Sequence, residues 1–373
     1  MKKIKLLALL FCVSNISFAQ SSLIDSLIQN NYTQLQPVST TKSFTGKGWD
    51  LLVKEMRNAN SVLIGETHFT NEVPFFTAAV IDSVKFDNYF HEIDPYTNKI
   101  IEAKIKSLAP NQMRDFLEKY KSNFSFLSRG ADFEVYEKLV HKGINTFGAE
   151  QISVFSDRLI ISELLKVTKN KQAKEIYTQM LQKADELMLK DKTFYIFTDD
   201  CLEKTNALLA LSISAPERTQ LEALKLSRGI YLERNHHLRI QLLKSILLKE
   251  LPNWENKKNL FKFGAGHTPK GESLLKIFDI GNLVFNVEDG NFRNSLHIMI
   301  DGQGETEDVE STKMYVSFLK VVQSDDWYCF DLRPLQKSIA AGKLTIESQQ
   351  LLRIIKGNDY LIYVPKFTKS EKF

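Results

Sequence analysis

The 373-residue sequence has little of what defines several special classes of protein. Its three cysteines exclude a disulfide scaffold, and no Cys-x-x-Cys pair indicates a zinc ribbon or a redox motif. With 16 glycines and 9 prolines, the chain is neither collagen-like nor mostly disordered. The 49 basic and 45 acidic residues nearly balance, without the basic runs that nucleic-acid-binding proteins concentrate. We therefore expect a globular protein with a small-molecule or peptide partner and no nucleic-acid partner.

The first nineteen residues have the pattern of a secretory signal peptide. Three lysines precede the apolar run 6–13, and small residues stand at the −3 and −1 positions before a cleavage site between Ala19 and Gln20. The bulky Phe11 before Cys12 argues against a lipoprotein signal. The apolar run is too short to span a bilayer, and no later segment reaches that length. We expect export to the periplasm or the medium, with N-terminal sequencing of the exported protein beginning at Gln20.

Short apolar runs that alternate with helical segments predict an α/β fold with a largely parallel sheet flanked by helices. The predicted strands are 61–64, 88–93, 144–147, 259–263, 283–287, 297–300, 327–330 and 360–364. The predicted helices are 47–59, 73–84, 96–120, 134–142 and 333–340. The mostly helical stretch of about 156–251 is too long for one crossover, so we interpret it as a helical insertion or cap. Residues 20–373 are predicted to form a single α/β domain.

Four of these strands end in a carboxylate or an imidazole. The runs that follow them are Gly-Glu-Thr-His at 65–68, His-Glu-Ile-Asp at 91–94, Gly-Ala-Glu-Gln at 148–151 and Gly-Ala-Gly-His at 264–267. The carboxyl ends of parallel strands face one crevice, and glycine at a strand exit permits a sharp turn. We therefore expect five side chains to meet in that crevice: Glu66, His68, Glu92, Glu150 and His267. The two histidines would converge although 199 positions separate them.

The same residues carry a family resemblance. The paired Gly-x-x-His motifs at 65–68 and 264–267 resemble those of the erythromycin esterase and ChaN-like superfamily, which includes the TraB and TIKI proteins. Residues 90–94 look like its second strand with an acidic end. Glu-Arg-Asn at 233–235 is similar to the TraB branch, and Asp-Leu-Arg-Pro-Leu at 331–335 to the esterase branch. The similarity spans about residues 47 to 365.

The resemblance implies a site with His68 and His267 at its centre and Glu66 and Glu92 as acidic partners. It also implies that Arg234 is the basic residue of a long helix that faces the site. The sequence departs from the esterases where Asn235 follows this arginine and where Phe69 follows the first histidine. Both departures argue against macrolide specificity in particular.

Two chemistries fit this set of residues. In the first, His68 and His267 with Glu92 or Glu66 ligate a divalent metal ion that acidifies water and polarises a carbonyl. In the second, one histidine takes a proton from water, a glutamate holds its tautomer, and Arg234 stabilises the developing oxyanion. A serine nucleophile is disfavoured because no Gly-x-Ser-x-Gly motif occurs. We expect Glu92 to be the nearest carboxylate, then Glu66, then Glu150.

The primary functional hypothesis is an exported hydrolase that cleaves an ester or an amide bond. The alternative is a ChaN-like protein that binds haem or another small ligand in the same crevice without turnover, and a third reading is a degenerate scaffold. Cys201 and Cys329, the two cysteines left after export, are either a disulfide pair or two buried thiols.

Overall fold

The computed structural model describes residues 22–190, 193–304 and 313–372, and the predicted signal peptide lies outside them. The chain forms two compact units. Unit 1 combines the residues up to Lys85 with Phe263–Lys369, and unit 2 combines Phe86–Lys262 with the C-terminal residues from Ser370. Among the described residues, no helix is both long enough and apolar enough to cross a membrane.

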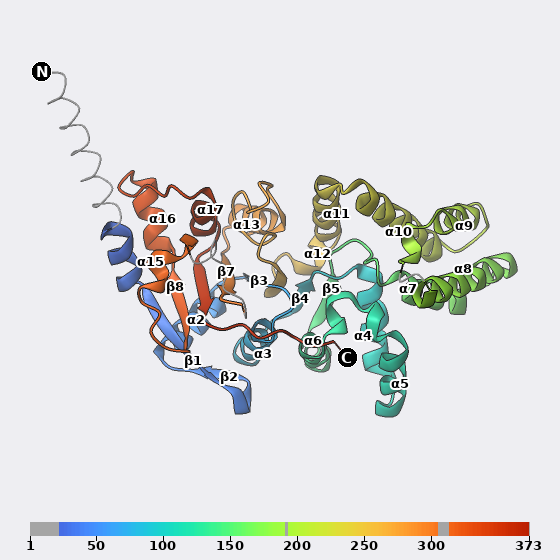
Figure 1. The fold of residues 1–373 in the computed structure, drawn as a ribbon, viewed down its shortest axis with the longest axis horizontal. Coiled ribbons are helices and arrows are strands. Elements are labelled where there is room, and N and C mark those ends of the chain that lie inside the picture. The colour runs from blue at the N-terminus through green and yellow to red at the C-terminus, as the bar shows by residue number, and fades with distance from the viewer. Residues whose placement is uncertain (1–21, 191–192, 305–312, 373) are drawn as a thin grey trace, which may run out of the picture. The chain divides into compact units, whose positions relative to one another are not determined.

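Unit 1 contains six strands that lie side by side in one sheet (Figure 1). Their order is β2 (Ser43–Thr45), β1 (Tyr32–Val38), β8 (Trp327–Asp331), β9 (Tyr360–Val364), β7 (Ser295–Gly302) and β3 (Ser61–Glu66). The pairs β3–β7 and β7–β9 are parallel, whereas β9–β8, β8–β1 and β1–β2 are antiparallel. Every residue of β3 is buried, which is typical of a strand covered on both faces.

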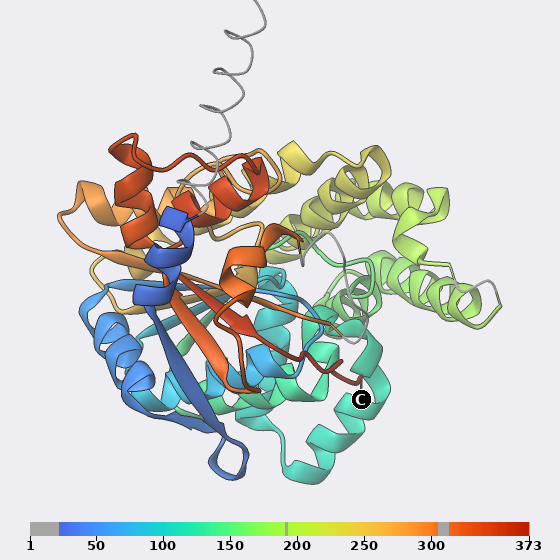
Figure 2. The same ribbon diagram turned by 60° about the vertical axis from the view of Figure 1, so that its left-hand side comes forward.

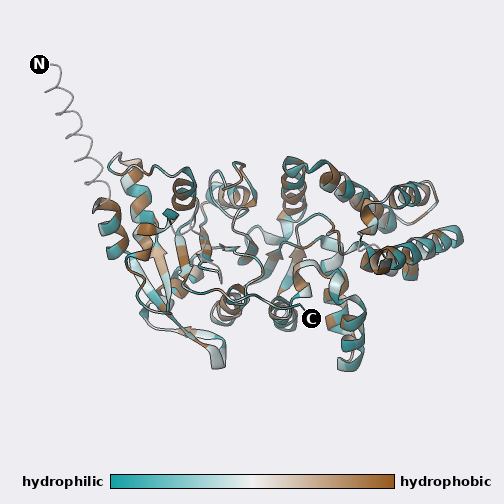
Figure 3. Ribbon diagram, in the orientation of Figure 1, coloured by the Kyte–Doolittle hydropathy of each residue, from teal (hydrophilic) through white to brown (hydrophobic). Residues whose placement is uncertain are grey.

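Helices cover both faces of the unit 1 strands. They are α2 (Lys47–Asn58), α3 (Glu72–Ser83), α13 (Ile280–Gly290), α15 (Val316–Leu319), α16 (Arg333–Ala340) and α17 (Gln349–Gly357). Alternation along β8 shows the two faces: the Trp327 ring packs with Phe44 and Phe76 beside α2 and α3, whereas Tyr328 and Phe330 join the core under α16 and α17. Hydrophobic residues, brown in Figure 3, gather along these strands.

Unit 2 carries a parallel group of three strands, in the order β6 (Asn259–Gly264), β4 (Asn88–His91) and β5 (Asn145–Gly148). The last two residues of β6 belong to unit 1. Phe90 on the middle strand stacks between Phe147 and Phe261, with ring centroids 4.7 Å away on each side. This aromatic row sets the register, since a shift of one residue would turn the rings to the other face.

The helices of unit 2 include the predicted helical insertion. They are α4 (Pro95–Ser107), α5 (Pro110–Tyr120), α6 (Gly130–His141), α7 (Asp157–Val167), α8 (Lys171–Lys190), α9 (Asp199–Leu209), α10 (Ala215–Glu233), α11 (His236–Lys249) and α12 (Leu251–Trp254). The segment 156–251 is therefore helical as expected, and Figure 2 shows α7 to α10 as a group of neighbouring helices, coloured green to yellow-green. They share a core of their own that includes Tyr177, Met180 and Leu221.

The structure confirms the α/β fold with a largely parallel sheet and corrects one predicted element. Residues 283–287 are not a strand but part of α13. Periodicity alone cannot decide whether a short apolar run is a strand or a helix. Here Asp279 caps a helix by accepting the Ile280 N–H, and Ile280 and Val284 lie on the buried side of that helix. β1, β2 and α17 were not predicted from the sequence. Cys201 and Cys329 are both buried and free of disulfide bonds.

Candidate active site

The turn after β3 carries the first candidate pair. Glu66 ends the strand and is 7% exposed, and its Oε1 lies 2.9 Å from Nδ1 of His68, which is about one-third exposed. The turn is closed by Thr70, whose hydroxyl donates to the Thr67 carbonyl, and Phe69 lies in the left-handed region with φ of 66°. The spacing of two residues thus lets a strand-end carboxylate contact the imidazole that follows it.

The loop after β6 carries a second histidine–carboxylate pair. Its carboxylate was not predicted from the sequence. Nδ1 of His267 lies 2.8 Å from Oδ2 of Asp279, and the side chains are 6% and 0% exposed. The other Asp279 oxygen accepts the Ile280 N–H at the start of α13. The Gly281 N–H donates to the His267 carbonyl, and a Cβ at this glycine would lie 2.1 Å from the Thr268 carbonyl oxygen. Glycine is therefore required where α13 approaches the histidine loop.

The two histidine-bearing turns contact each other. The Ala265 N–H donates to the Glu66 carbonyl at 3.0 Å, which joins the turn after β6 to the end of β3. A Cβ on Gly65 would lie 2.3 Å from Oγ1 of Thr268, so only glycine allows this approach. Both Gly-x-x-His motifs therefore lie in unit 1 against one another, and each holds its histidine beside a carboxylate.

These contacts assign the tautomer of both imidazoles. An ionised carboxylate only accepts hydrogen bonds, so Nδ1 of His68 and of His267 each carries a proton that it donates. In a neutral imidazole the lone pair is then on Nε2. A carboxylate behind an imidazole also stabilises the imidazolium that forms when Nε2 takes a proton. Both histidines are thus arranged for proton transfer at Nε2.

A third carboxylate lies beside the first turn, at the end of β7. Asp301 accepts hydrogen bonds from the Thr67 hydroxyl at 3.4 Å and from the Tyr315 hydroxyl at 2.7 Å. Burial raises the pKa of Tyr315, and the Asp301 charge raises it further, so the phenol stays protonated and donates. Asp301 follows a predicted strand and precedes Gly302, but no histidine follows within three residues, as one does in both Gly-x-x-His motifs, to draw attention to it in the sequence.

In unit 2, Glu92 and Glu150 follow β4 and β5 and are 5% and 7% exposed. Both contact Arg239 of α11, whose Nη2 lies 2.7 Å from Oε1 of Glu92 and whose Nε lies 3.0 Å from Oε1 of Glu150. Burial raises the pKa of Glu150, and the arginine opposes this only in part. The two glutamates are therefore a buried pair that one guanidinium holds together.

Arg239 was not singled out in the sequence, where Arg234 is the expected basic residue. Arg234 is exposed between α10 and α11, with a left-handed backbone at φ of 50°, rather than on the face of a long helix. Its role in the site stays a prediction. Nothing in the sequence distinguishes Arg239 from the other basic residues of the helical stretch, because its partners come from strands roughly 90 and 150 residues earlier.

The residues of unit 1 do not by themselves fit a metal centre. Among the described residues, no three His, Cys, Asp or Glu side chains are grouped so that they could hold a metal ion. Each site histidine instead directs Nδ1 at one carboxylate. The contacts support proton transfer.

No family model and no curated protein matches the sequence. Solved structures match its fold. A mutant of the erythromycin esterase EreC in its open conformation has a TM-score of 0.58 and 12% identity over 91% of this chain and 98% of that one. The chain has the fold of an erythromycin esterase. A protein from Bacillus cereus has a TM-score of 0.56 and 12% identity over 95% of this chain and 99% of that one. A succinoglycan biosynthesis protein has a TM-score of 0.56 and 14% identity over 94% and 98%.

These neighbours confirm, at the level of the fold, the resemblance to the erythromycin esterase and ChaN-like superfamily. Coverage of more than nine-tenths in both directions means that most of the helical stretch 156–251 lies within the match.

Proposed function

We propose that this protein is a hydrolase that cleaves an ester or an amide bond in a small molecule or peptide by general acid–base catalysis. The observation that carries the proposal is the contact between two turns that each hold a histidine–carboxylate pair, His68 with Glu66 and His267 with Asp279. We further propose that the protein acts after export, as its N-terminal sequence predicts.

In the proposed mechanism, Nε2 of one histidine takes a proton from water as the water oxygen forms a bond to the carbonyl carbon. The second histidine begins the cycle as an imidazolium, and it gives its Nε2 proton to the leaving oxygen or nitrogen as the bond from the carbonyl carbon to that atom breaks. The first histidine is then the imidazolium and the second is neutral, and proton exchange with solvent restores the starting state. Each carboxylate stabilises the imidazolium form of its histidine. Under this proposal Glu66 and Asp279 are positioning residues.

The test begins with a screen of the purified protein against p-nitrophenyl esters and p-nitroanilide amides of different acyl groups. On a substrate found in this way, His68→Ala and His267→Ala should each lower kcat/KM by at least about 100-fold. The double variant should lose little more, since residues that act as a unit are not additive. His141→Ala is the matched control, because His141 is exposed on α6. Full activity in either single variant would overturn the proposal.

The positioning role of Asp279 needs a separate readout. Asp279→Asn keeps the size of the side chain but removes its charge, so the imidazolium of His267 loses stabilisation. We expect kcat to fall at least tenfold and the limb of its pH profile that reports His267 to move to lower pH, because loss of the neighbouring negative charge destabilises the imidazolium. A purely structural role would lower the melting temperature and leave the limb of the pH profile in place.

Chelation separates this mechanism from the metal-assisted one. Dialysis against EDTA should leave kcat/KM unchanged if His68 and His267 act by proton transfer alone. Loss of activity that added zinc restores would instead favour the reading in which the two histidines and Glu92 or Glu66 ligate a divalent ion.

A further inference from the structure

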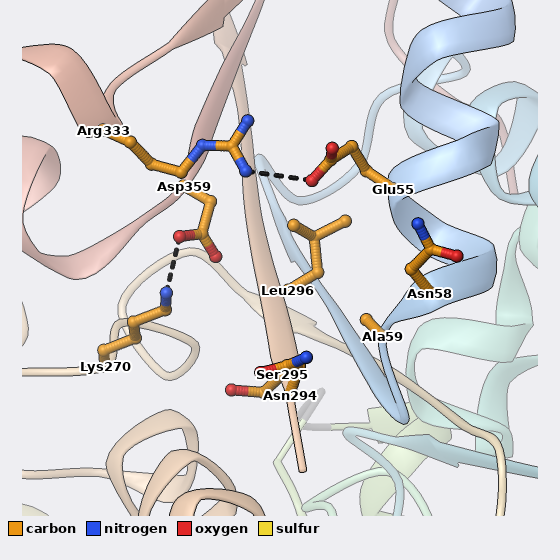
Figure 4. Close-up of a pocket in the computed structure, with 9 residues that line it drawn as sticks. All are labelled: Glu55, Asn58, Ala59, Lys270, Asn294, Ser295, Leu296, Arg333 and Asp359. Atoms are coloured by element: carbon orange, nitrogen blue, oxygen red, sulfur yellow. Dashed lines mark hydrogen bonds and ion pairs between the residues drawn. The ribbon is translucent and has the colours of Figure 1, made fainter.

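Unit 1 contains a pocket of about 290 Å³, and its lining includes Lys270, three residues after His267 (Figure 4). Asn58 and Ala59 at the end of α2 form one wall, and Ser295 and Leu296 at the start of β7 form the floor. The pocket therefore lies where β3 and β7 begin. Glu66 stands at the other end of β3, five residues after Ser61, or roughly 16 Å away at 3.3 Å per residue.

The charged side chains of the pocket neutralise one another. Lys270 Nζ lies 2.5 Å from Asp359 Oδ1, and Arg333 Nη1 lies 2.9 Å from Glu55 Oε2, both drawn as dashed lines in Figure 4. Arg333 also forms a two-pronged contact with Asp331. The lining thus carries two cations and two anions, each beside its counter-ion. An ionic ligand would have to compete with these counter-ions, whereas a neutral ligand leaves both ion pairs intact.

Uncharged hydrogen-bonding groups also face this space. The side-chain amides of Asn58 and Asn294 line the pocket, and neither forms a hydrogen bond to another residue in the described part of the chain. An amide offers two N–H donors and a carbonyl acceptor. The pocket therefore presents donors and acceptors that a ligand with both kinds of group can satisfy.

Ser295 contributes an acceptor rather than a nucleophile. Its hydroxyl lies 2.9 Å from Nε2 of His297, whose Nδ1 donates to the Thr268 carbonyl at 2.6 Å. Nε2 must then accept a hydrogen bond from the serine hydroxyl, so the serine oxygen has only its lone pairs to offer to a ligand. Burial, and next the charge of Lys270, lower the pKa of His297 to about 4, so this imidazole is a weak base and does not activate the serine.

We propose that this pocket binds a neutral polyhydroxylated ligand of about the size of a monosaccharide. Each hydroxyl both donates and accepts, which matches the mixed lining and leaves its ion pairs intact. At about 30 Å³ per water molecule, the volume holds roughly ten non-hydrogen atoms, close to one sugar ring with its hydroxyls. The pocket lies at the opposite end of β3 from Glu66, so the proposal does not depend on hydrolysis.

The test uses the full-length mature protein and a fixed panel of probes: D-glucose, D-galactose, N-acetyl-D-glucosamine and myo-inositol. Saturation-transfer NMR and calorimetry should detect saturable binding of at least one of them. Asn58→Ala with Asn294→Ala should weaken that binding at least tenfold, through loss of two hydrogen-bonding groups. Asn286→Ala, at an exposed position of α13, should leave the affinity unchanged. Equal melting temperatures for all variants show that each is folded.

Glycine and inorganic phosphate complete the panel as a zwitterion and an anion. Preferential binding of either at this pocket would overturn the proposal, because the lining would then favour charge over hydroxyl groups. The absence of binding by all four neutral probes would also overturn it, as would sugar binding that the two asparagine substitutions leave unchanged. Hydrolytic activity is not read in any arm, so failure here is distinct from failure of the proposed hydrolase.

Discussion

Replacement of Gly65 by alanine tests the contact on which the candidate active site depends. The added Cβ would lie 2.3 Å from Oγ1 of Thr268 and 3.1 Å from Cα of Ala265. An ordinary contact is at least 3.4 Å, so the threonine must move by roughly 1 Å. Thr268 is fully buried, so its movement must displace the atoms packed around it. Overpacking of this kind costs about 1–3 kcal/mol, and we expect Gly65→Ala to lower the free energy of unfolding by that amount.

A second substitution identifies the cause of this loss. Thr268→Ala removes Oγ1, a buried atom with no hydrogen-bond partner among the described residues, and the Cγ2 methyl, so alone it should cost about 1 kcal/mol, mainly through the lost methyl. Combined with Gly65→Ala, it leaves Ala265 Cα at 3.1 Å as the nearest atom and relieves the severe overlap. Urea unfolding of the four proteins, followed by circular dichroism and tryptophan fluorescence, should give a favourable coupling energy of about 1–2 kcal/mol.

Two outcomes would refute this reasoning. If Gly65→Ala is as stable as the wild type, the two turns do not pack as the structure has them. If Thr268→Ala restores none of the lost stability, the overlap is not with this hydroxyl. On a confirmed substrate, kcat/KM should follow the same pattern, because a displaced turn moves His68 or His267 out of position.

Three further predictions concern other parts of the chain. Arg239→Met leaves Glu92 and Glu150 buried without their cation and should cost about 3–5 kcal/mol in urea unfolding, whereas Arg234→Met at its exposed position should change stability by less than about 0.5 kcal/mol. Burial raises the pKa of the Asp94 carboxyl to about 6, above its ordinary 3.8. The folded protein therefore binds this proton more tightly than the unfolded chain, and the free energy of unfolding falls by about 3 kcal/mol as pH rises from about 4 to 6. Asp94→Asn should therefore flatten the dependence of the unfolding free energy on pH between 4 and 6. An unchanged slope would mean that other groups cause this pH dependence. Titration with haemin should leave the Soret band of free haemin unshifted, and a saturable shift would favour the ChaN-like alternative over the hydrolase.

Most of the parallel core was predictable because its strands are continuous apolar runs. Val62–Ile64 is buried on both faces and bounded by polar residues, so its pattern needs no partner to be recognised. The prediction of a strand at 283–287 was wrong because a helix that is buried along one side produces a similar apolar run. β1 was missed because its sequence, Tyr-Thr-Gln-Leu-Gln-Pro-Val, neither alternates strictly nor forms an apolar run, and Leu35 is its one buried residue.

By itself the sequence determined the histidine turns, because a glycine and a strand end are local features. The separation of two residues between Glu66 and His68 allows their contact without help from the rest of the chain. Only the tertiary structure decided the long-range partners. Asp279 reaches His267 across twelve residues because α13 begins beside the β6 loop, and Arg239 rather than Arg234 meets Glu92 because the chain turns between α10 and α11. Such pairings depend on how elements pack, and packing joins residues whose separation along the chain carries no pattern.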